Sequence, residues 1–165
     1  MAKVGVTVTG NLDPLKDLRA CLAGLDDLDV SVGYHDPVLV PDSDGLTVPT
    51  LAAIQEFGTD DIPARPFMKR GAAAADDDVS ARELAKVSAG TQSPTLAVQA
   101  IGQEIGRSIL AELLTAGSWA EPNDPDTIKS KKSSTPLYAG HGSLRKNLTV
   151  VVSRGGSEVS KTRVE

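Results

Sequence analysis

Aromatic residues and cysteines are scarce in this chain. Its 165 residues include two Phe, two Tyr and one Trp, so aromatic residues make up 3% of the sequence. A core of Val, Leu, Ile and Ala buries less area per residue than an aromatic core, and we therefore expect a monomer of modest stability that gains stability by assembly. Cys21 is the one cysteine, which excludes an intrachain disulfide and fits a reducing cytoplasm.

Long apolar runs are absent as well. The first residues, Met1–Gly5, lack the apolar segment of a secretory signal. No stretch approaches the roughly 18 apolar residues that a membrane-spanning helix needs. We therefore expect no membrane partner.

The net charge of -5 hides an asymmetry between the two ends of the chain. Residues 128–165 hold eight basic and two acidic residues, whereas residues 1–127 hold nine basic and 20 acidic residues. Such a distribution suits a subunit that packs against copies or layers of opposite charge. A solvated basic tail that arose by chance explains it equally well.

The hydrophobic pattern predicts a mixture of strands and helices. Alternating apolar residues are typical of strands, and apolar residues three and four apart are typical of helices. Thr47 is an expected helix N-cap and Gly58 the expected end of that helix. The pattern predicts strands at 4–8, 29–34 and 148–152, and helices at 13–25, 47–58 and from 67 through the alanines at 72–75, with residues 79–93 weakly helical.

The longest predicted helix covers about residues 95–116. Its apolar residues recur at three- and four-residue steps. Gly102 and Gly106 lie four apart on this helix, although each glycine costs about 1 kcal/mol relative to alanine in a helix interior. Close approach of another backbone to one face of the helix is the expected reason for both.

An irregular arm is expected at residues 117–142, and the residues from Gly155 onward are expected to fray. A chain of this length forms one domain. We expect a single α+β domain over residues 1–165, with a small mixed or antiparallel sheet, helices packed on one face of it, the long helix and the extended arm.

Two segments carry recognisable motifs. The first is Glu56-Phe57-Gly58-Thr59, followed by Ile62-Pro63-Ala64-Arg65-Pro66-Phe67. The second contains Pro122, Pro125, Thr127-Ile128, Lys131 or Lys132, Ser134, Pro136-Leu137, Leu144-Arg145 and Leu148. In order and spacing they resemble the neck and tail-completion proteins of tailed bacteriophages, over roughly residues 30–152. Where that family carries Asp-Thr-Gly, this chain has Tyr138-Ala139-Gly140-His141-Gly142.

The resemblance implies a structural virion protein. It implies a homo-oligomeric ring, with a hexamer as the expected form, that completes the tail or joins it to the head. Its partners would be copies of itself and the adjacent head-tail connector, tail terminator or tail tube proteins. It would be assembled in the cytoplasm of the host bacterium, would have no enzymatic activity and would need no cofactor. A tail terminator or a head-tail connector subunit is the nearest alternative.

The motifs also suggest interface residues. Arg65 is held between two prolines and would contact a carboxylate of a neighbouring subunit or element, or else pair with Glu56 or Asp60 of its own subunit. Phe67 would be an interface anchor or a core residue. Trp119 would anchor the arm on a neighbour or pack on its own helix. The expected interface set is Phe57, Arg65, Phe67, Trp119, Ile128, Leu137, Leu144 and Arg145.

The basic run of the arm allows a contact with nucleic acid. Lys129, Lys131 and Lys132 would meet phage DNA in the lumen of a ring, without sequence preference, or form a solvated loop. The run lacks interleaved aromatics, which disfavours a specific nucleic-acid-binding module.

Histidine chemistry is the remaining alternative. His35-Asp36 and His141 with Ser143 are the candidates for a small hydrolase, but no nucleophile elbow accompanies them. The sequence also lacks zinc-ligand spacing and a phosphate-binding glycine loop. We therefore predict no catalytic, cofactor-binding or metal-binding residues.

Overall fold

The computed structural model describes residues 14–131, 133–137 and 142–164. The strand predicted at 4–8 lies outside these residues, as do Lys132 and His141. The helices are α1 (Pro14–Ala23), α2 (Val48–Phe57), α3 (Phe67–Ala73), α4 (Asp77–Ser88), α5 (Pro94–Leu114), the short 3-10 helix η1 (Ala116–Ser118), α6 (Pro125–Lys131) and α7 (Ser143–Asn147). The strands are β1 (Leu28–Gly33), β2 (Thr149–Arg154) and β3 (Ser157–Arg163).

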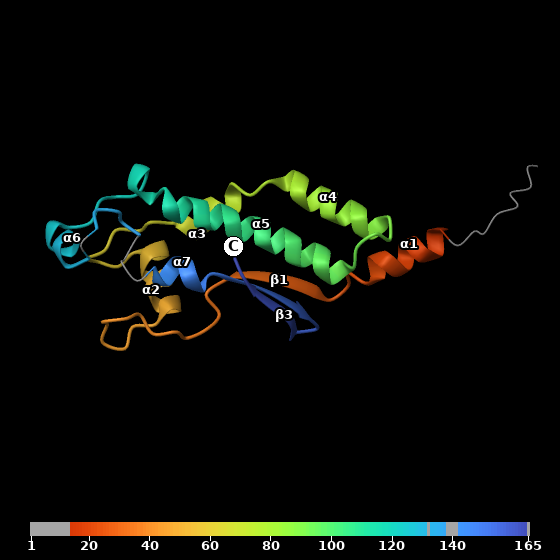
Figure 1. Ribbon diagram of the computed structural model, residues 1–165, viewed down its shortest axis with the longest axis horizontal. Coiled ribbons are helices and arrows are strands. Elements are labelled where there is room, and N and C mark those ends of the chain that lie inside the picture. The colour runs from red at the N-terminus through yellow and green to blue at the C-terminus, as the bar shows by residue number, and fades with distance from the viewer. Residues whose placement is uncertain (1–13, 132, 138–141, 165) are drawn as a thin grey trace, which may run out of the picture.

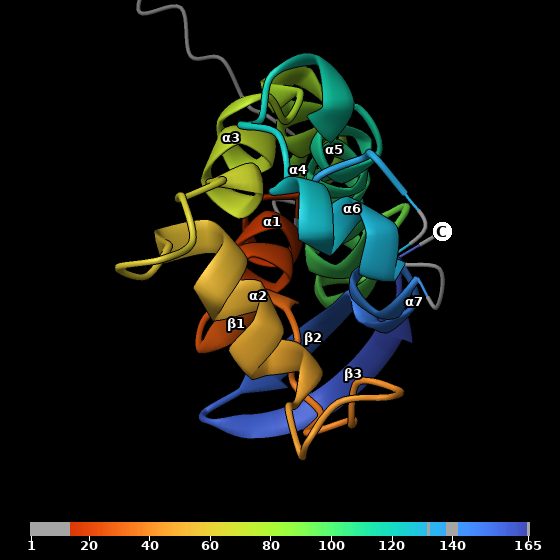
Figure 2. The ribbon, with the colours of Figure 1, turned by 90° about the vertical axis from the view of Figure 1, so that its left-hand side faces the viewer.

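The three strands form an antiparallel sheet in the order β1-β2-β3. Val30 lies opposite Val152 and Val32 opposite Val150, so the two apolar rows share one face of the sheet. Helix α5 packs on this sheet and also contacts α3 and α4 (Figure 1). Figure 2, turned by 90°, shows α3, α4 and α5 gathered above the strands. The α+β class is confirmed, with the sheet in its antiparallel form.

Close packing explains the two glycines of α5. A Cβ atom added to Gly102 would lie 2.5 Å from a methyl of Val150 and 2.6 Å from a methyl of Val30. One added to Gly106 would collide with Val164. Both glycines therefore let the helix settle directly onto the valines of the sheet. The expected close packing is confirmed, but valine side chains of the same chain, and not another backbone, approach the helix.

The core lies where α2, α3 and α5 meet the sheet. Phe67 and Val48 are fully buried there, and Ile109 is nearly so. The ring of Phe67 lies 6.5 Å from that of Tyr34, at a tilted angle. Helices α3 and α5 come close together at Gly71, because a Cβ there would lie 2.6 Å from the backbone nitrogen of Ile109. A core with so few aromatic rings depends on this close packing of small residues.

Several sequence-based expectations are wrong. The residues after Gly155 do not fray, because 157–163 form β3. Gly155 and Gly156, with φ of 55° and 81°, make the two-residue turn that pairs it with β2. Residues 77–88 form the regular helix α4, capped by the side chain of Asp76. The arm is not extended throughout, since it contains η1 and α6.

Candidate functional site

The first motif begins with a carboxylate that caps a helix from outside it. Pro66 stands at the N-cap of α3 and offers no side-chain hydrogen bond. The carboxylate of Glu56 takes that role, accepting hydrogen bonds from the backbone nitrogens of Met68 at 2.8 Å and Lys69 at 2.9 Å. These groups would otherwise lack partners in the first turn, so Glu56 fixes α3 against the end of α2.

A tight turn connects α2 to the proline segment. Gly58 has a φ of 75°, and a Cβ there would lie 2.7 Å from the carbonyl oxygen of Ile62. The hydroxyl of Thr59 accepts hydrogen bonds from the backbone nitrogens of Asp61 and Ile62. Glycine and threonine thus both serve the turn, which directs the chain toward Arg65.

Arg65 connects the first motif to the arm. Its side chain is 3% exposed, and its backbone nitrogen donates to the carbonyl oxygen of Gln55 at 2.7 Å. The guanidinium donates to the Gln55 side chain at 2.9 Å, to the carbonyl oxygen of Glu121 at 2.9 Å and to that of Pro122 at 3.3 Å. Burial lowers the pKa of Arg65, and the charge of Glu121 opposes that shift.

Trp119, at the start of the arm, packs on its own subunit. Its ring nitrogen donates to the carbonyl oxygen of Glu112 at 3.1 Å. The guanidinium of Arg70 lies 4.4 Å from the centre of its ring and pairs with the carboxylate of Glu112 at 2.8 Å. This cation–π and ion-pair cluster holds the arm against α3 and α5.

The remainder of the arm folds back toward the body. The side chain of Asn123 donates to the carbonyl oxygen of Thr135 at 3.3 Å, and the Nζ of Lys131 donates to that of Pro136 at 2.8 Å. The carboxylate of Asp124 accepts from the backbone nitrogen of Asp126 at the start of α6. These bonds close the described part of the arm into a loop beside α7.

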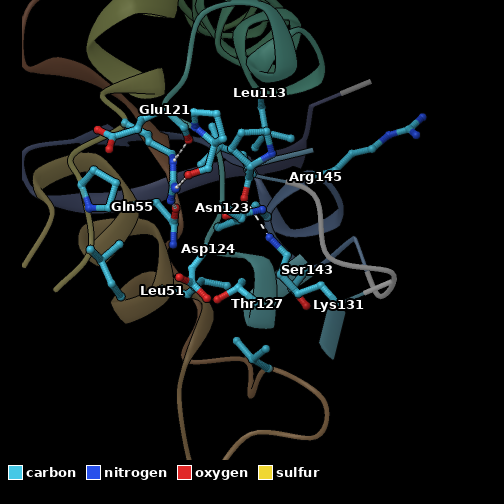
Figure 3. A pocket seen from close by; sticks show the side chains of 18 of the residues that line it. Leu51, Gln55, Leu113, Glu121, Asn123, Asp124, Thr127, Lys131, Ser143 and Arg145 are labelled. Atoms are coloured by element: carbon cyan, nitrogen blue, oxygen red, sulfur yellow. Dashed lines mark hydrogen bonds between the residues drawn. The ribbon is translucent and has the colours of Figure 1, made fainter. Parts of the chain in front are cut away.

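The loop borders an open cavity of about 520 Å³, which we name the Arg65 cavity. Its lining comes from the end of α2, the proline segment, the arm and α7. Figure 3 shows Gln55, Glu121, Asn123 and Lys131 around this space, with the long side chain of Arg145 extending away from it. Both sequence motifs contribute to its walls, although residues far apart in the chain supply them.

The eight predicted interface residues divide by burial. Arg65, Phe67, Leu137 and Leu144 are buried in the monomer. Phe67 lies in the core, and the other three line the Arg65 cavity, so none of the four lies on the outer surface of the monomer. The other four reach the surface: Phe57 is 80% exposed, Arg145 is exposed, and Trp119 and Ile128 are half-buried.

The two described lysines of the predicted basic run have different surroundings. Lys129 is exposed and forms an ion pair with Asp126 at 3.3 Å. Lys131 lines the Arg65 cavity, where burial and the charge of Arg65 lower its pKa. Lys132 lies outside the described residues. Of the two described lysines, Lys129 is exposed and Lys131 is half-buried.

His35 follows β1 and lies within hydrogen-bonding distance of two hydroxyl groups of the sheet. Its Nδ1 is 2.7 Å from the hydroxyl of Thr149, and its Nε2 is 2.8 Å from that of Ser31. Partial burial and the charge of Lys161 lower its pKa, and Asp36 and Glu158 oppose this. Ser143 is buried at the start of α7, and its proposed partner His141 lies outside the described residues.

Sequence reasoning gave Glu56 no role beyond a possible partner for Arg65, and it missed Gln55 and Asn123 entirely. The partners of Glu56 are 12 and 13 residues further along the chain, beyond any local capping pattern. Gln55 and Asn123 owe their roles to the path of the arm, for which the sequence carries no signal. The partner of Arg65 was expected to be a carboxylate, and it is a set of neutral oxygens.

Comparison with known proteins adds no assignment. No family model, no curated protein and no solved structure matches the chain. Among the described residues, no helix combines the length and apolar character needed to cross a membrane.

Proposed function

We propose that this chain is a structural subunit of the neck or tail of a tailed bacteriophage, which assembles into a homo-oligomeric ring. The ring, a hexamer by expectation, completes the tail or joins it to the head. Copies of the chain and the adjacent connector, terminator or tail tube proteins are its partners. Assembly is its function, without catalysis.

The meeting of the two motifs at Arg65 carries this proposal. The resemblance rests on two segments whose residues are scattered over roughly half the chain. Arg65 of the first segment bonds to Glu121 and Pro122, at the beginning of the second. Glu56 and Gly58 serve the geometry that places Arg65 there. Because residues of the two motifs contact each other in space, their resemblance to the neck and tail-completion proteins has more support than a match of sequence letters alone.

The exposure of Phe57 gives independent support. It belongs to the first motif, yet its side chain is 80% exposed at the end of α2. Large aromatic residues on an open surface are typical of interfaces, where they become anchors on assembly. Leu39, which is 63% exposed, lies in the loop that leads into α2. This part of the molecule is the first place to look for a contact with another subunit.

The test is a measurement of mass, by sedimentation velocity, for the purified protein alone and with isolated tail tubes. We expect a defined oligomer that binds the end of the tubes. A protein that remains monomeric and does not bind tubes or connectors would contradict the proposal. Binding to tubes that already carry a terminator would separate a tail-completion role from a terminator role.

A further inference from the structure

Two cations meet in the Arg65 cavity without a carboxylate partner. Arg65 bonds to the Gln55 side chain and to two carbonyl oxygens, and Lys131 bonds to the carbonyl oxygen of Pro136. No carboxylate of the described residues lies within ion-pair distance of either cation. Burial lowers the pKa of Lys131, and the like charge of Arg65, which shares this partly buried site, lowers it further. An anion placed between them would relieve this repulsion.

The cavity has the size and character of a binding site. Its volume of about 520 Å³ lies within the range of roughly 300–1,000 Å³ typical of ligand sites. Leu51, Leu113 and Leu144 supply apolar walls. Three acidic residues also line it (Asp61, Glu121 and Asp124), but all three are exposed and therefore screened by solvent. The buried charge is positive, which favours a carboxylate carried on a short peptide segment.

The chain itself carries such a segment. Asp76-Asp77-Asp78 is its one run of three consecutive acidic residues, and all three are exposed. It follows the exposed alanines 72–74, which are small and apolar. One carboxylate, that of Asp76, caps α4 by accepting from the backbone nitrogen of Asp78. The cap requires a single carboxylate, and the other two carboxylates, in the first turn of α4, remain exposed to solvent.

We propose that the Arg65 cavity of one copy binds the Asp76–Asp78 segment of a second copy, with carboxylates reaching Lys131 and Arg65. The segment forms the N-cap and the first turn of α4 and contributes nothing to the cavity of its own subunit. Two different patches therefore meet, which makes the contact head-to-tail and able to close into a ring. This contact is one between neighbouring subunits of the proposed ring, so it rests on the proposed function. It also gives the acidic and basic parts of the chain complementary roles.

Two defective variants test this contact. Lys131→Glu reverses a charge in the cavity and leaves the acidic segment intact. A triple variant with Asp76→Asn, Asp77→Asn and Asp78→Asn removes the charges of the segment and leaves the cavity intact. The asparagine at 76 still caps α4. Lys129→Glu is the matched control on the same helix, because Lys129 is exposed and does not line the cavity.

Sedimentation velocity should show self-association of the wild type and of the control, and at least about tenfold weaker association of either defective variant alone. Mixing the two defective variants should give a 1:1 pair that grows no further, because the pair retains one intact cavity and one intact segment. If circular dichroism shows that Lys131→Glu has lost its fold, Lys131→Gln replaces it, with a weaker effect expected.

A wild type that stays monomeric would overturn the inference, as would a defective variant that associates like wild type or a mixture that does not pair. The proposed function is tested separately by binding to tail tubes. Wild type that binds tubes while the mixture fails to pair would keep the proposed function and reject this contact. The opposite result would keep the contact and reject the phage assignment.

Discussion

The Nε of Arg65 donates a hydrogen bond of 2.9 Å to the carbonyl oxygen of Glu121, 56 residues further along the chain. The bond joins a segment stiffened by two prolines to the start of the arm. Because Arg65 also bonds to Gln55 of α2, its guanidinium connects α2 to the arm directly. This buried side chain, together with the Trp119 cluster, therefore holds the arm on the body.

Replacing Arg65 with alanine should loosen the arm and destabilise the fold. The change removes three hydrogen bonds of a charged donor and leaves a void, at a cost of roughly 2–4 kcal/mol. Urea denaturation should show the loss, and limited proteolysis should cut the arm faster than in the wild type. Arg145→Ala is the control, since Arg145 is exposed, and it should change stability by no more than about 0.5 kcal/mol. Equal stability of the two variants would contradict the role given to Arg65.

Glu56→Gln should weaken α3. Both oxygens of the carboxylate accept hydrogen bonds from backbone nitrogens at the start of that helix. An amide retains one acceptor oxygen and turns an NH₂ group toward the other nitrogen, at a cost of about 1–2 kcal/mol. Urea denaturation measures the effect, and hydrogen exchange should show faster exchange at Met68 and Lys69. Unchanged exchange at these two amides would show that the cap is dispensable.

Alanine substitutions at glycines should rank by what the new Cβ meets. At Gly71 it meets the backbone of Ile109, which cannot move without separating α3 from α5. At Gly102 it meets methyl groups of Val30 and Val150. We expect a loss of about 1–3 kcal/mol for both, larger for Gly71→Ala, despite the helix propensity gained. Gly117→Ala, with nothing within 4 Å, should be neutral. Thermal denaturation gives the ranking, and a neutral Gly71→Ala would contradict the packing described for α3.

The sequence predicts the regular parts of this fold well, for a physical reason. Elements with strong local periodicity, such as α5 and β2, were placed within about two residues of where they occur. Even the close approach at Gly102 could be predicted, because an interior glycine needs a packing reason. The partner of Gly102 could not be predicted, since the pattern of one helix does not state which element covers it.

The errors arise where tertiary contacts decide the structure. Strand β3 shows little alternation of apolar and polar residues, since Val159 stands among polar residues, and the strand is held mainly by pairing to β2. The turn at Gly155-Gly156 was a hairpin signal that could have revealed it. Arg65 illustrates the deeper limit, because its partners are backbone carbonyls of the arm. A carbonyl is present in every residue, so no side-chain motif marks it.

The free energy of unfolding should decrease as the pH is lowered through the range in which His35 titrates. Its pKa in the folded chain is below the ordinary value of 6.5, because of partial burial and the charge of Lys161. As the pH drops through about 6.5, the unfolded chain gains a proton that the folded chain resists, so stability decreases until the folded pKa is reached. Glutamine does not titrate, so the free energy of unfolding of wild type relative to that of His35→Gln should decrease from pH 7.5 toward pH 5 in urea denaturation. A constant difference would contradict this role for His35.

Phe57→Ser should separate assembly from folding. The side chain of Phe57 is 80% exposed in the monomer, so its loss should change the free energy of unfolding by no more than about 0.5 kcal/mol. If Phe57 becomes buried between subunits, removing its ring should weaken association by about tenfold or more. Leu96→Ser is the control, because Leu96 is 57% exposed on α5, outside both motifs. Sedimentation velocity compares the two variants with wild type. Equal effects on association would mean that general surface hydrophobicity, and not the first motif, directs assembly.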